Sequence, residues 1–517
     1  MCFARQRRGW QQVKKSSYLA NAVILTGAGL ILRAAGMIFR VLIAGKIGAE
    51  GMGLYQLIFT VYQLFITAST AGISVAATWI VTAELAENRK GCVRSALRIT
   101  VLLGIFLGTV AGFFQFVLSD VMSQWWLGDQ RAAVCLRILA PSLPFMAAAA
   151  ALRGYFLARR RAGPNAAAQL FEQAVRIGLV LFLLEGALKK GIAACCVAVV
   201  VGNTVSEAAS CIWMAIAAKI DLPRLEQGEK PQKANKVISR LKGILLPIAG
   251  GRISSEALRT VENVMVPACL TAAIGSRTIA MEQYGGLKGM AMPVLFFPFS
   301  LLGTLATLLT PEITEAYLKK NQKQLQKLVG RVISITNLIA ILLGGLFTLL
   351  AYPLGELLYH SEEIGFYLRV LGPLMPLMYL ESMVDGILKG MEEQMATFRY
   401  SLWDSVIRIA AIALLVPKTG MKGFLAVMVF SNLFTGLLNF RRLVIASQIK
   451  LKVWKWIVAP VLCVGVSCFV VIQWRIPLIV QYSQLLQTII IAAMVMLLYV
   501  TLAALLGILP IKEFLKK

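Results

Sequence analysis

Apolar runs of membrane length recur between positions 20 and 508, and short basic segments separate them. A helix needs roughly 20 apolar residues to cross the hydrocarbon core of a bilayer. Backbone N–H and C=O groups find no water there, so a crossing segment must satisfy them internally as a helix. The pattern therefore predicts an all-α polytopic membrane protein with about fourteen transmembrane helices. They are residues 20–45, 54–83, 95–118, 132–157, 164–185, 191–218, 243–270, 286–310, 325–350, 364–389, 398–416, 420–446, 454–474 and 483–508.

The composition supports a membrane protein rather than a soluble one. Of the 517 residues, 15% are charged and 58% are hydrophobic, whereas about a quarter of the residues in a typical soluble domain are charged. The first apolar stretch is too long for the apolar region of a signal peptide, and it carries Arg33 and Arg40. We therefore interpret this stretch as the first membrane span.

Basic residues gather in the loops on one side of the predicted membrane. The formal net charge is +27, and about 35 of the 52 Lys and Arg residues fall in the terminal segments and in alternate loops. Cytoplasmic loops are enriched in these residues, which places both termini of this predicted cell-membrane protein in the cytoplasm. No nucleic-acid partner is predicted, because such proteins carry soluble basic modules that this sequence lacks.

Neither a metal nor a cofactor is predicted. The nine cysteines lie mostly inside apolar spans and form no C-x-x-C pair, which is typical of small packing residues. The sequence has no phosphate-binding G-x-x-x-x-G-K-[ST] signature, so ATP is not expected to act within this chain. No catalytic residue is predicted either, and we interpret the single histidine, His360, as incidental.

An internal repeat relates two parts of the chain. The segment from Arg137 to Pro144 (RILAPSLP) recurs 232 residues later as RVLGPLMP, from Arg369 to Pro376. At the same offset FEQAVRI (171–177) matches WDSVIRI (403–409). An even number of predicted spans separates the copies, so the two halves share one orientation and are predicted to be related by a pseudo-two-fold axis along the membrane normal.

The repeat sets the predicted domain organisation. The domains are a basic cytoplasmic tail (1–19), an N-terminal six-helix bundle (20–218), a cytoplasmic linker (219–242), a C-terminal six-helix bundle (243–446), and two additional helices with a basic tail (447–517). Transporters built from such repeats place the substrate path between the halves.

Two equivalent spans carry charges inside apolar sequence. Arg33 and Arg40 lie seven residues apart, nearly two turns, on one face of the first span. The seventh span carries a polar stripe roughly 120° wide. Its members are Arg252, Glu256, Arg259, Glu262 and Asn263. Charges in mid-span normally face a cavity or a partner, and guanidinium groups bind phosphate oxygens strongly. We predict that these seven residues line a substrate cavity; mutual neutralisation of acids and arginines within the bundle is the alternative.

Two further pairs are predicted to form ion pairs within their helices. Glu172 and Arg176 are four residues apart, as are Asp404 and Arg408 at the repeated positions. Residues at this spacing are neighbours on a helix surface. We interpret both pairs as structural, with a role in ion coupling as the alternative.

Several motifs resemble a known family. LRAAG (32–36) and IGAEGMGLY (47–55) resemble the start of the stage V sporulation protein B group. YGGLKGMAMPVLFFP (284–298), followed by LTPEITEA (309–316), is similar to that group as well. The group belongs to the polysaccharide-transport branch of the MOP flippase superfamily, which also contains the lipid II flippases and the MATE antiporters.

The resemblance implies two six-helix bundles around a central cavity and transport by alternating access. It further implies export of an undecaprenyl-diphosphate-linked saccharide or a peptidoglycan precursor, in spore cortex or cell-envelope polysaccharide synthesis. Arg33 matches the first of the span-1 cavity arginines of the lipid II flippases, in the motif Arg-x-x-Gly, and Arg40 lies one residue beyond their second. The implied partners are the lipid-linked saccharide and membrane lipids, with cell-envelope synthesis enzymes as further candidates.

Three other functions remain open from the sequence. A cation-coupled multidrug antiporter of the MATE type is the main alternative, and it would depend on an embedded acid such as Glu256 or Asp385. A membrane glycosyltransferase or polymerase would need a large outer loop with a catalytic acid or base, and the predicted outer loops are short. A scaffold for a spore-envelope complex would bind partners without transport.

Overall fold

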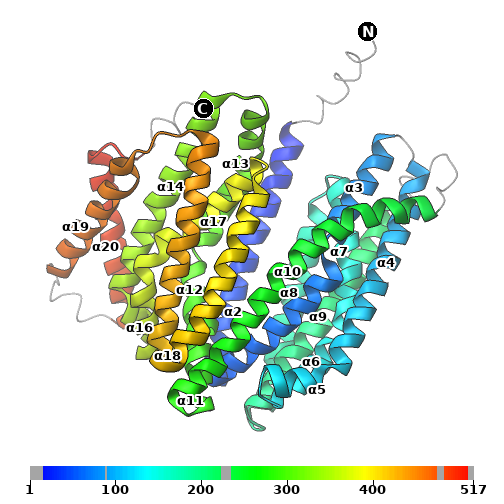
Figure 1. The fold of residues 1–517 in the computed structure, drawn as a ribbon, viewed down its shortest axis with the longest axis horizontal. Helices are drawn as coiled ribbons and strands as arrows, with labels where there is room; N and C mark the ends of the chain where they lie inside the picture. The colour runs from blue at the N-terminus through cyan, green and yellow to red at the C-terminus, as the bar shows by residue number, and fades with distance from the viewer. Residues whose placement is uncertain (1–14, 88–89, 223–233, 474–482, 510–517) are drawn as a thin grey trace. The chain divides into compact units, whose positions relative to one another are not determined.

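The computed structural model describes residues 15–87, 90–222, 234–473 and 483–509, and every regular element in these ranges is a helix (Figure 1). The chain divides into two compact units. The first unit comprises Met1–Phe39 and Leu54–Val264, and the second comprises Arg40–Gly53 and Met265–Lys517. Two long helices therefore contribute to both units: α2 (Lys15–Thr70) and α10 (Ala234–Ile274).

The first unit is built from helices that pack along their length. Its remaining elements are α3 (Ile73–Ala86), α4 (Lys90–Val117), α5 (Ser119–Val121), the π-helical η1 (Met122–Trp126), α6 (Arg131–Leu139), α7 (Ser142–Ala158), α8 (Gly163–Leu188) and α9 (Ile192–Asp221). Helix α7 contacts α3, α4 and α9, and α8 runs beside α9 (Figure 1). A core of large apolar side chains, including Tyr155, Phe156 and Met214, holds these helices together.

The second unit contains more interruptions. Its elements are α11 (Arg277–Tyr284), η3 (Gly285–Ala291), α12 (Met292–Phe296), α13 (Phe299–Leu318), α14 (Gln322–Leu349), α15 (Ala351–Tyr359), α16 (Glu362–Leu371), η4 (Gly372–Leu374), α17 (Met375–Gly390), α18 (Gln394–Ser447), η5 (Trp454–Val458), α19 (Ala459–Gln473) and α20 (Gln484–Leu505). Helices α19 and α20 pack on each other and on α14.

Ten helical segments in the described ranges are long and apolar enough to cross a membrane. Two of them, Gly27–Ala86 and Gln394–Ser447, each cover two predicted spans. The predicted spans 286–310 and 364–389 fall on chains of shorter helices that are not among the ten. The chain is thus a multi-pass helical membrane protein, and the number fourteen stays a prediction.

Glycine residues create the breaks in the two longest helices. Gly48 has φ 70° and ψ −179°, and Gly420 has φ 62° and ψ −141°. Side chains other than hydrogen are strongly disfavoured in this region of backbone conformation. The sequence predicted loops at residues 46–53 and 417–419, but the helix continues through each with only a kink, at Gly48 and at Gly420. The predicted span 54–83, conversely, is interrupted after Thr70, where Gly72 takes φ 81°.

The repeated sequence has a repeated local structure. A Cβ atom on Gly112 of α4 would lie 2.7 Å from the carbonyl oxygen of Ala140, and one on Gly344 of α14 would lie 2.8 Å from that of Gly372. Both residues of the second contact lie 232 positions after those of the first. Glycine lets two helix backbones approach closely in a membrane. The offset found in the sequence therefore extends to helix packing within each unit.

Each unit also carries an ion pair, here called a charge clamp, at the loop after a repeated helix. That helix is α7 in the first unit and α17 in the second. In the first unit, Arg161 Nη1 lies 2.5 Å from Asp221 Oδ1 at the end of α9. In the second, Glu393 occupies the position 232 residues after Arg161, and its Oε1 lies 2.7 Å from Arg442 Nη2 on α18. The loop residue is basic in the first clamp and acidic in the second, so the two clamps have opposite polarity.

The motifs that resemble the stage V sporulation protein B group form a close helix contact in the second unit. A Cβ atom on Gly285 would collide with the carbonyl oxygen of Ala49 and the backbone nitrogen of Gly53. One on Gly53 would in turn collide with the carbonyl oxygen of Met281. The glycines of IGAEGMG and YGGLKG thus allow the segment after Gly48 to pack against α11 and η3.

Replacement of Gly285 by alanine should destabilise the protein by about 3 kcal/mol or more, because overpacking against backbone atoms cannot be relieved by side-chain rotation. Gly286→Ala is the matched control, since its added Cβ would lie 3.4 Å from Tyr367 Cε2, an ordinary contact distance. Thermal unfolding in detergent, followed by circular dichroism, measures both variants. Equal melting temperatures for the two would contradict the close contact.

Candidate functional site

The predicted cavity residues lie on α2 and α10. Arg33 and Arg40 are carried by α2; Arg33 is exposed and Arg40 is half-buried. Within the second unit, Arg40 lies in electrostatic reach of the Tyr359 hydroxyl, which donates a hydrogen bond of 3.4 Å to the Met290 carbonyl oxygen.

The five predicted residues of α10 differ in exposure. Arg252 and Arg259 are exposed, Glu256 and Asn263 are half-buried, and Glu262 is 4% exposed. Neither Arg252 nor Arg259 forms an ion pair with any residue in the described ranges. The i,i+3 and i,i+4 acids on the same helix therefore do not neutralise these two guanidinium groups.

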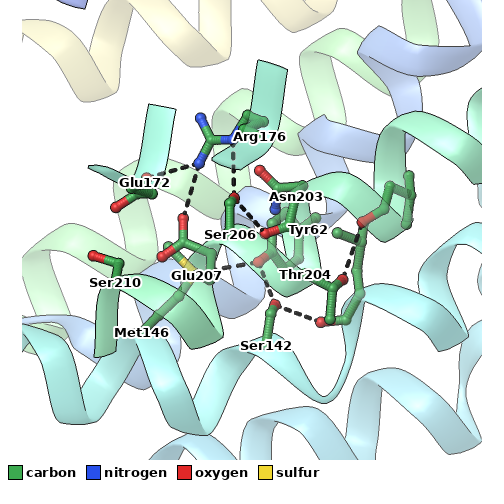
Figure 2. Close-up of polar contacts among 12 residues, drawn as sticks. Tyr62, Ser142, Met146, Glu172, Arg176, Asn203, Thr204, Ser206, Glu207 and Ser210 are labelled. Carbon is green, nitrogen blue, oxygen red and sulfur yellow. Dashed lines mark hydrogen bonds and ion pairs between the residues drawn. The ribbon is translucent and has the colours of Figure 1, made fainter. Parts of the chain in front are cut away.

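A charge network in the first unit joins α7, α8 and α9 (Figure 2). Arg176 Nη2 lies 2.7 Å from Glu172 Oε1 and 3.3 Å from Glu207 Oε1. Its Nε donates to Ser206 Oγ at 3.2 Å. On the other side, Arg153 Nη2 lies 3.2 Å from Glu172 Oε2. Two arginines and two glutamates thus compensate one another, with all four side chains less than a third exposed.

Hydroxyl contacts from α2 lie beside this network (Figure 2). Tyr62 is 1% exposed; its hydroxyl forms a hydrogen bond with that of Ser142 and donates to Met146 Sδ at 3.2 Å. These contacts tie the second part of α2 to the start of α7. Together, the charge network and these hydroxyl contacts involve four helices of the first unit, α2, α7, α8 and α9.

The second unit contains a related but smaller arrangement. Asp404 and Arg408 form an ion pair within α18, and Ser431 Oγ donates to Asp404 Oδ1 at 2.7 Å. The structure thus contains both of the i,i+4 pairs that the sequence suggested. Whether they also act in ion coupling stays a prediction.

The two arrangements differ in charge balance. Arg153 of the first network corresponds, at the offset of 232, to Asp385 of α17, whose Oδ2 lies 2.5 Å from Lys389 Nζ. One turn earlier on α17, Glu381 is half-buried and forms no ion pair with any residue in the described part of the chain. It lies within electrostatic reach of both Asp404 and Arg408. This group of side chains on α17 and α18 therefore holds one carboxylate more than it holds basic groups.

Three of these charged residues were not predicted from the sequence. Arg153 lies on α7, near the end of the predicted span 132–157, and its guanidinium group contacts Glu172 of α8. Glu207 and Glu381 lie inside predicted apolar spans, and an ionisable residue at such a position is itself a signal of function or pairing. Their partners come from other helices, so no local spacing could reveal them.

Family models match most of the chain. The model "Polysaccharide biosynthesis protein" matches residues 18–266, and the model "MatE" matches residues 287–414. Among curated relatives, Stage V sporulation protein B of Bacillus subtilis (strain 168) is 27% identical over 453 residues, covering 85% of this chain and 86% of the relative. Lipid II flippase MurJ of the same organism is 25% identical over 178 residues, 33% of this chain and 32% of the relative.

Solved structures share the fold. A lipid II flippase MurJ in an inward closed conformation aligns with a TM-score of 0.71 at 13% identity, covering 94% of this chain and 98% of the other. An inward-facing multidrug resistance MATE family transporter of the MOP superfamily aligns with a TM-score of 0.61 at 14% identity, covering 83% and 100%. The chain is thus similar in sequence to stage V sporulation protein B, and it shares the fold of the lipid II flippase MurJ and of MATE transporters of the MOP superfamily.

Proposed function

We propose that this membrane transporter exports an undecaprenyl-diphosphate-linked saccharide or peptidoglycan precursor across the cytoplasmic membrane by alternating access. One observation carries the proposal: the arginines fall into two classes. Arg153, Arg176 and Arg408 are each paired with a carboxylate. Arg252 and Arg259 are exposed on α10 and have no carboxylate partner in the described ranges. An arginine in an apolar span that is not paired within the protein is expected to face a water-filled path or a ligand.

A diphosphate is the ligand that suits these groups. A guanidinium group donates two parallel hydrogen bonds to phosphate oxygens, and such charge-assisted bonds are roughly twice as strong as neutral ones. Arg252 and Arg259 lie seven residues apart on α10, nearly two turns, so they lie on the same side of the helix. In this proposal, Arg33, Arg40 and the polar residues Glu256, Glu262 and Asn263 complete the cavity lining.

The membrane potential favours the proposed direction. With the cytoplasm negative, moving one negative charge outward across 100 mV gains about 2.3 kcal/mol. Both termini in the cytoplasm and a role in spore or cell-envelope synthesis belong to the same proposal. They are supported by the asymmetric distribution of Lys and Arg and by the sporulation relative.

Reconstitution into liposomes tests the function. Full-length protein is inserted into vesicles that contain undecaprenyl diphosphate carrying a fluorescently labelled saccharide, and a membrane-impermeant reductant destroys the label on the outer leaflet. We expect the protein to expose the inner-leaflet label much faster than protein-free vesicles do. Equal rates in both, with protein confirmed as folded and inserted, would exclude this substrate class.

Cation-coupled antiport of a drug is the second candidate, and Glu381 is the observation that favours it. A half-buried carboxylate without an ion-pair partner in the described ranges can bind a proton or a cation. Uptake of a cationic dye by the same vesicles, driven by an imposed proton or sodium gradient and lost in Glu381→Gln, would support antiport. Absence of dye uptake alongside flipping of the labelled lipid would reject it.

A further inference from the structure

The connection between α18 and α19 has an unusual surface. Two membrane-length segments, Gln394–Ser447 and Trp454–Gln473, flank it, so residues 448–453 lie where the chain leaves and re-enters the membrane. Gln448 takes φ 51°, and the chain continues without helix to Lys452. We name Lys450–Lys455 the basic collar.

The basic collar is held in place by α14. Gln322 Nε2 donates to the carbonyl oxygen of Ser447 at 2.7 Å, and Gln326 Nε2 donates to that of Gln448 at 2.8 Å. On the other side of the collar, the buried Trp456 lies against Gly330 of α14, where a Cβ atom would be 3.7 Å from its Cζ2. These contacts at both ends give the short segment a fixed conformation.

Charged and apolar side chains alternate along the collar, and all of them are exposed. Lys450, Lys452 and Lys455 are exposed. Between them, Leu451 is 51% exposed, Val453 50% and Trp454 60%. Apolar side chains in this number at the end of two membrane spans are expected to enter the interfacial region of the bilayer, where indole rings are favoured.

The surroundings of the collar are basic as well. Lys323 and Lys327 are exposed on the first turns of α14, the same turns whose glutamines hold the collar. Neither residues 319–331 nor residues 441–459 contain an Asp or Glu. The positive charge of this surface is therefore not neutralised by acidic residues within these two segments.

We propose that the basic collar binds the headgroup phosphates of anionic phospholipids in the adjacent leaflet, with Trp454, Leu451 and Val453 inserted among the acyl chains. Lysine residues next to a membrane surface attract anionic lipids by electrostatics that salt weakens. A soluble nucleic acid or an acidic protein would match the charge but not the exposed apolar residues between the lysines. The site is separate from the transported substrate and does not depend on the proposed function.

Native mass spectrometry of full-length protein in nanodiscs tests the proposal. The nanodiscs contain phosphatidylcholine and phosphatidylglycerol, and the lipids retained after release of the protein are identified. The test variant is Lys450→Gln/Lys452→Gln/Lys455→Gln. The matched control is Lys189→Gln/Lys190→Gln/Lys418→Gln, which removes three exposed lysines that lie outside the collar. A lysine near an anionic surface contributes roughly fivefold to binding at low salt.

We expect the collar variant to retain phosphatidylglycerol with affinity lowered at least roughly tenfold relative to wild type, while the control variant keeps its wild-type preference. Bromination of the phosphatidylglycerol acyl chains should quench fluorescence in wild type more than in Trp454→Phe. Equal retention by the collar variant, or equal loss in the control, would overturn the proposal. Retention of phosphatidylcholine at the same level as phosphatidylglycerol in wild type would do so too.

Discussion

Replacement of Arg176 by leucine is expected to destabilise the protein by about 3–5 kcal/mol, the usual cost of removing one partner from a buried ion pair. Glu172 and Glu207 would each lose a guanidinium nitrogen, at 2.7 Å and 3.3 Å respectively. Glu207 would be affected most, because it is 6% exposed and its Oε2 has no hydrogen-bond partner in the described ranges. Thermal unfolding in detergent, with parallel measurement of the monodisperse fraction, records the loss.

A compensated variant separates unpaired charge from lost packing. Arg176→Leu combined with Glu207→Gln removes one basic and one acidic group and leaves the pair of Arg153 and Glu172, so it should recover much of the stability, since replacing a buried ion pair as a whole is often nearly neutral. If the double variant is no more stable than Arg176→Leu alone, the electrostatic account of the network is wrong. Arg399→Ala, at an exposed position of α18, serves as the control for arginine removal.

The double variant Arg252→Ala/Arg259→Ala is expected to lower the rate of lipid flipping by on the order of 100-fold or more. Each charge-assisted hydrogen bond to an anionic group contributes about 1.5–3 kcal/mol, or roughly 10- to 150-fold in a rate or binding constant. The vesicle assay with the labelled undecaprenyl diphosphate saccharide measures the effect. The melting temperature should change little, because both side chains are exposed and have no ion pair to lose in the described part of the chain.

Lysine substitutions at the same two positions test whether flipping depends on the guanidinium groups or only on their charge. Arg252→Lys/Arg259→Lys keeps the charge but removes the planar fork of donors, so it should retain only part of the flipping rate. Wild-type flipping in the alanine variant, with a wild-type melting temperature, would remove these arginines from the transport path. Arg399→Ala again controls for a general effect of losing an exposed guanidinium group.

Most helices were predictable from the sequence because each signal is local. A run of apolar residues of sufficient length identifies a span whatever its neighbours are. The interruptions were less predictable. Residues 286–310 appear as one apolar run, yet the chain forms η3, α12 and α13 there. Glycines at 286 and 289 and prolines at 293 and 298 weaken this run as a helix, and Gly289 packs closely against Met52, a residue distant in sequence.

The candidate site likewise combines contacts that local sequence spacing predicted with contacts that it could not predict. Glu172 and Arg176 could be paired from their spacing alone, since residues four apart are neighbours on one helix. Glu207 joins them from α9 and Arg153 from α7, and these associations depend on how helices pack rather than on spacing. The exposure of Arg252 and Arg259 likewise depends on which neighbouring helices approach α10. Sequence periodicity identified the stripe but could not determine its solvent access.

The opposite polarity of the two clamps has a consequence for assembly during membrane insertion. Duplicated halves offer interchangeable surfaces, and a loop from one copy could dock on the helix end of the other. Here such a cross-docked intermediate would bring Arg161 against Arg442, or Glu393 against Asp221, instead of the native pairs. Like charges repel at these distances, more strongly at a partly buried position than in water. A cross-docked intermediate would therefore lack both ion pairs, which favours closure of each half on itself.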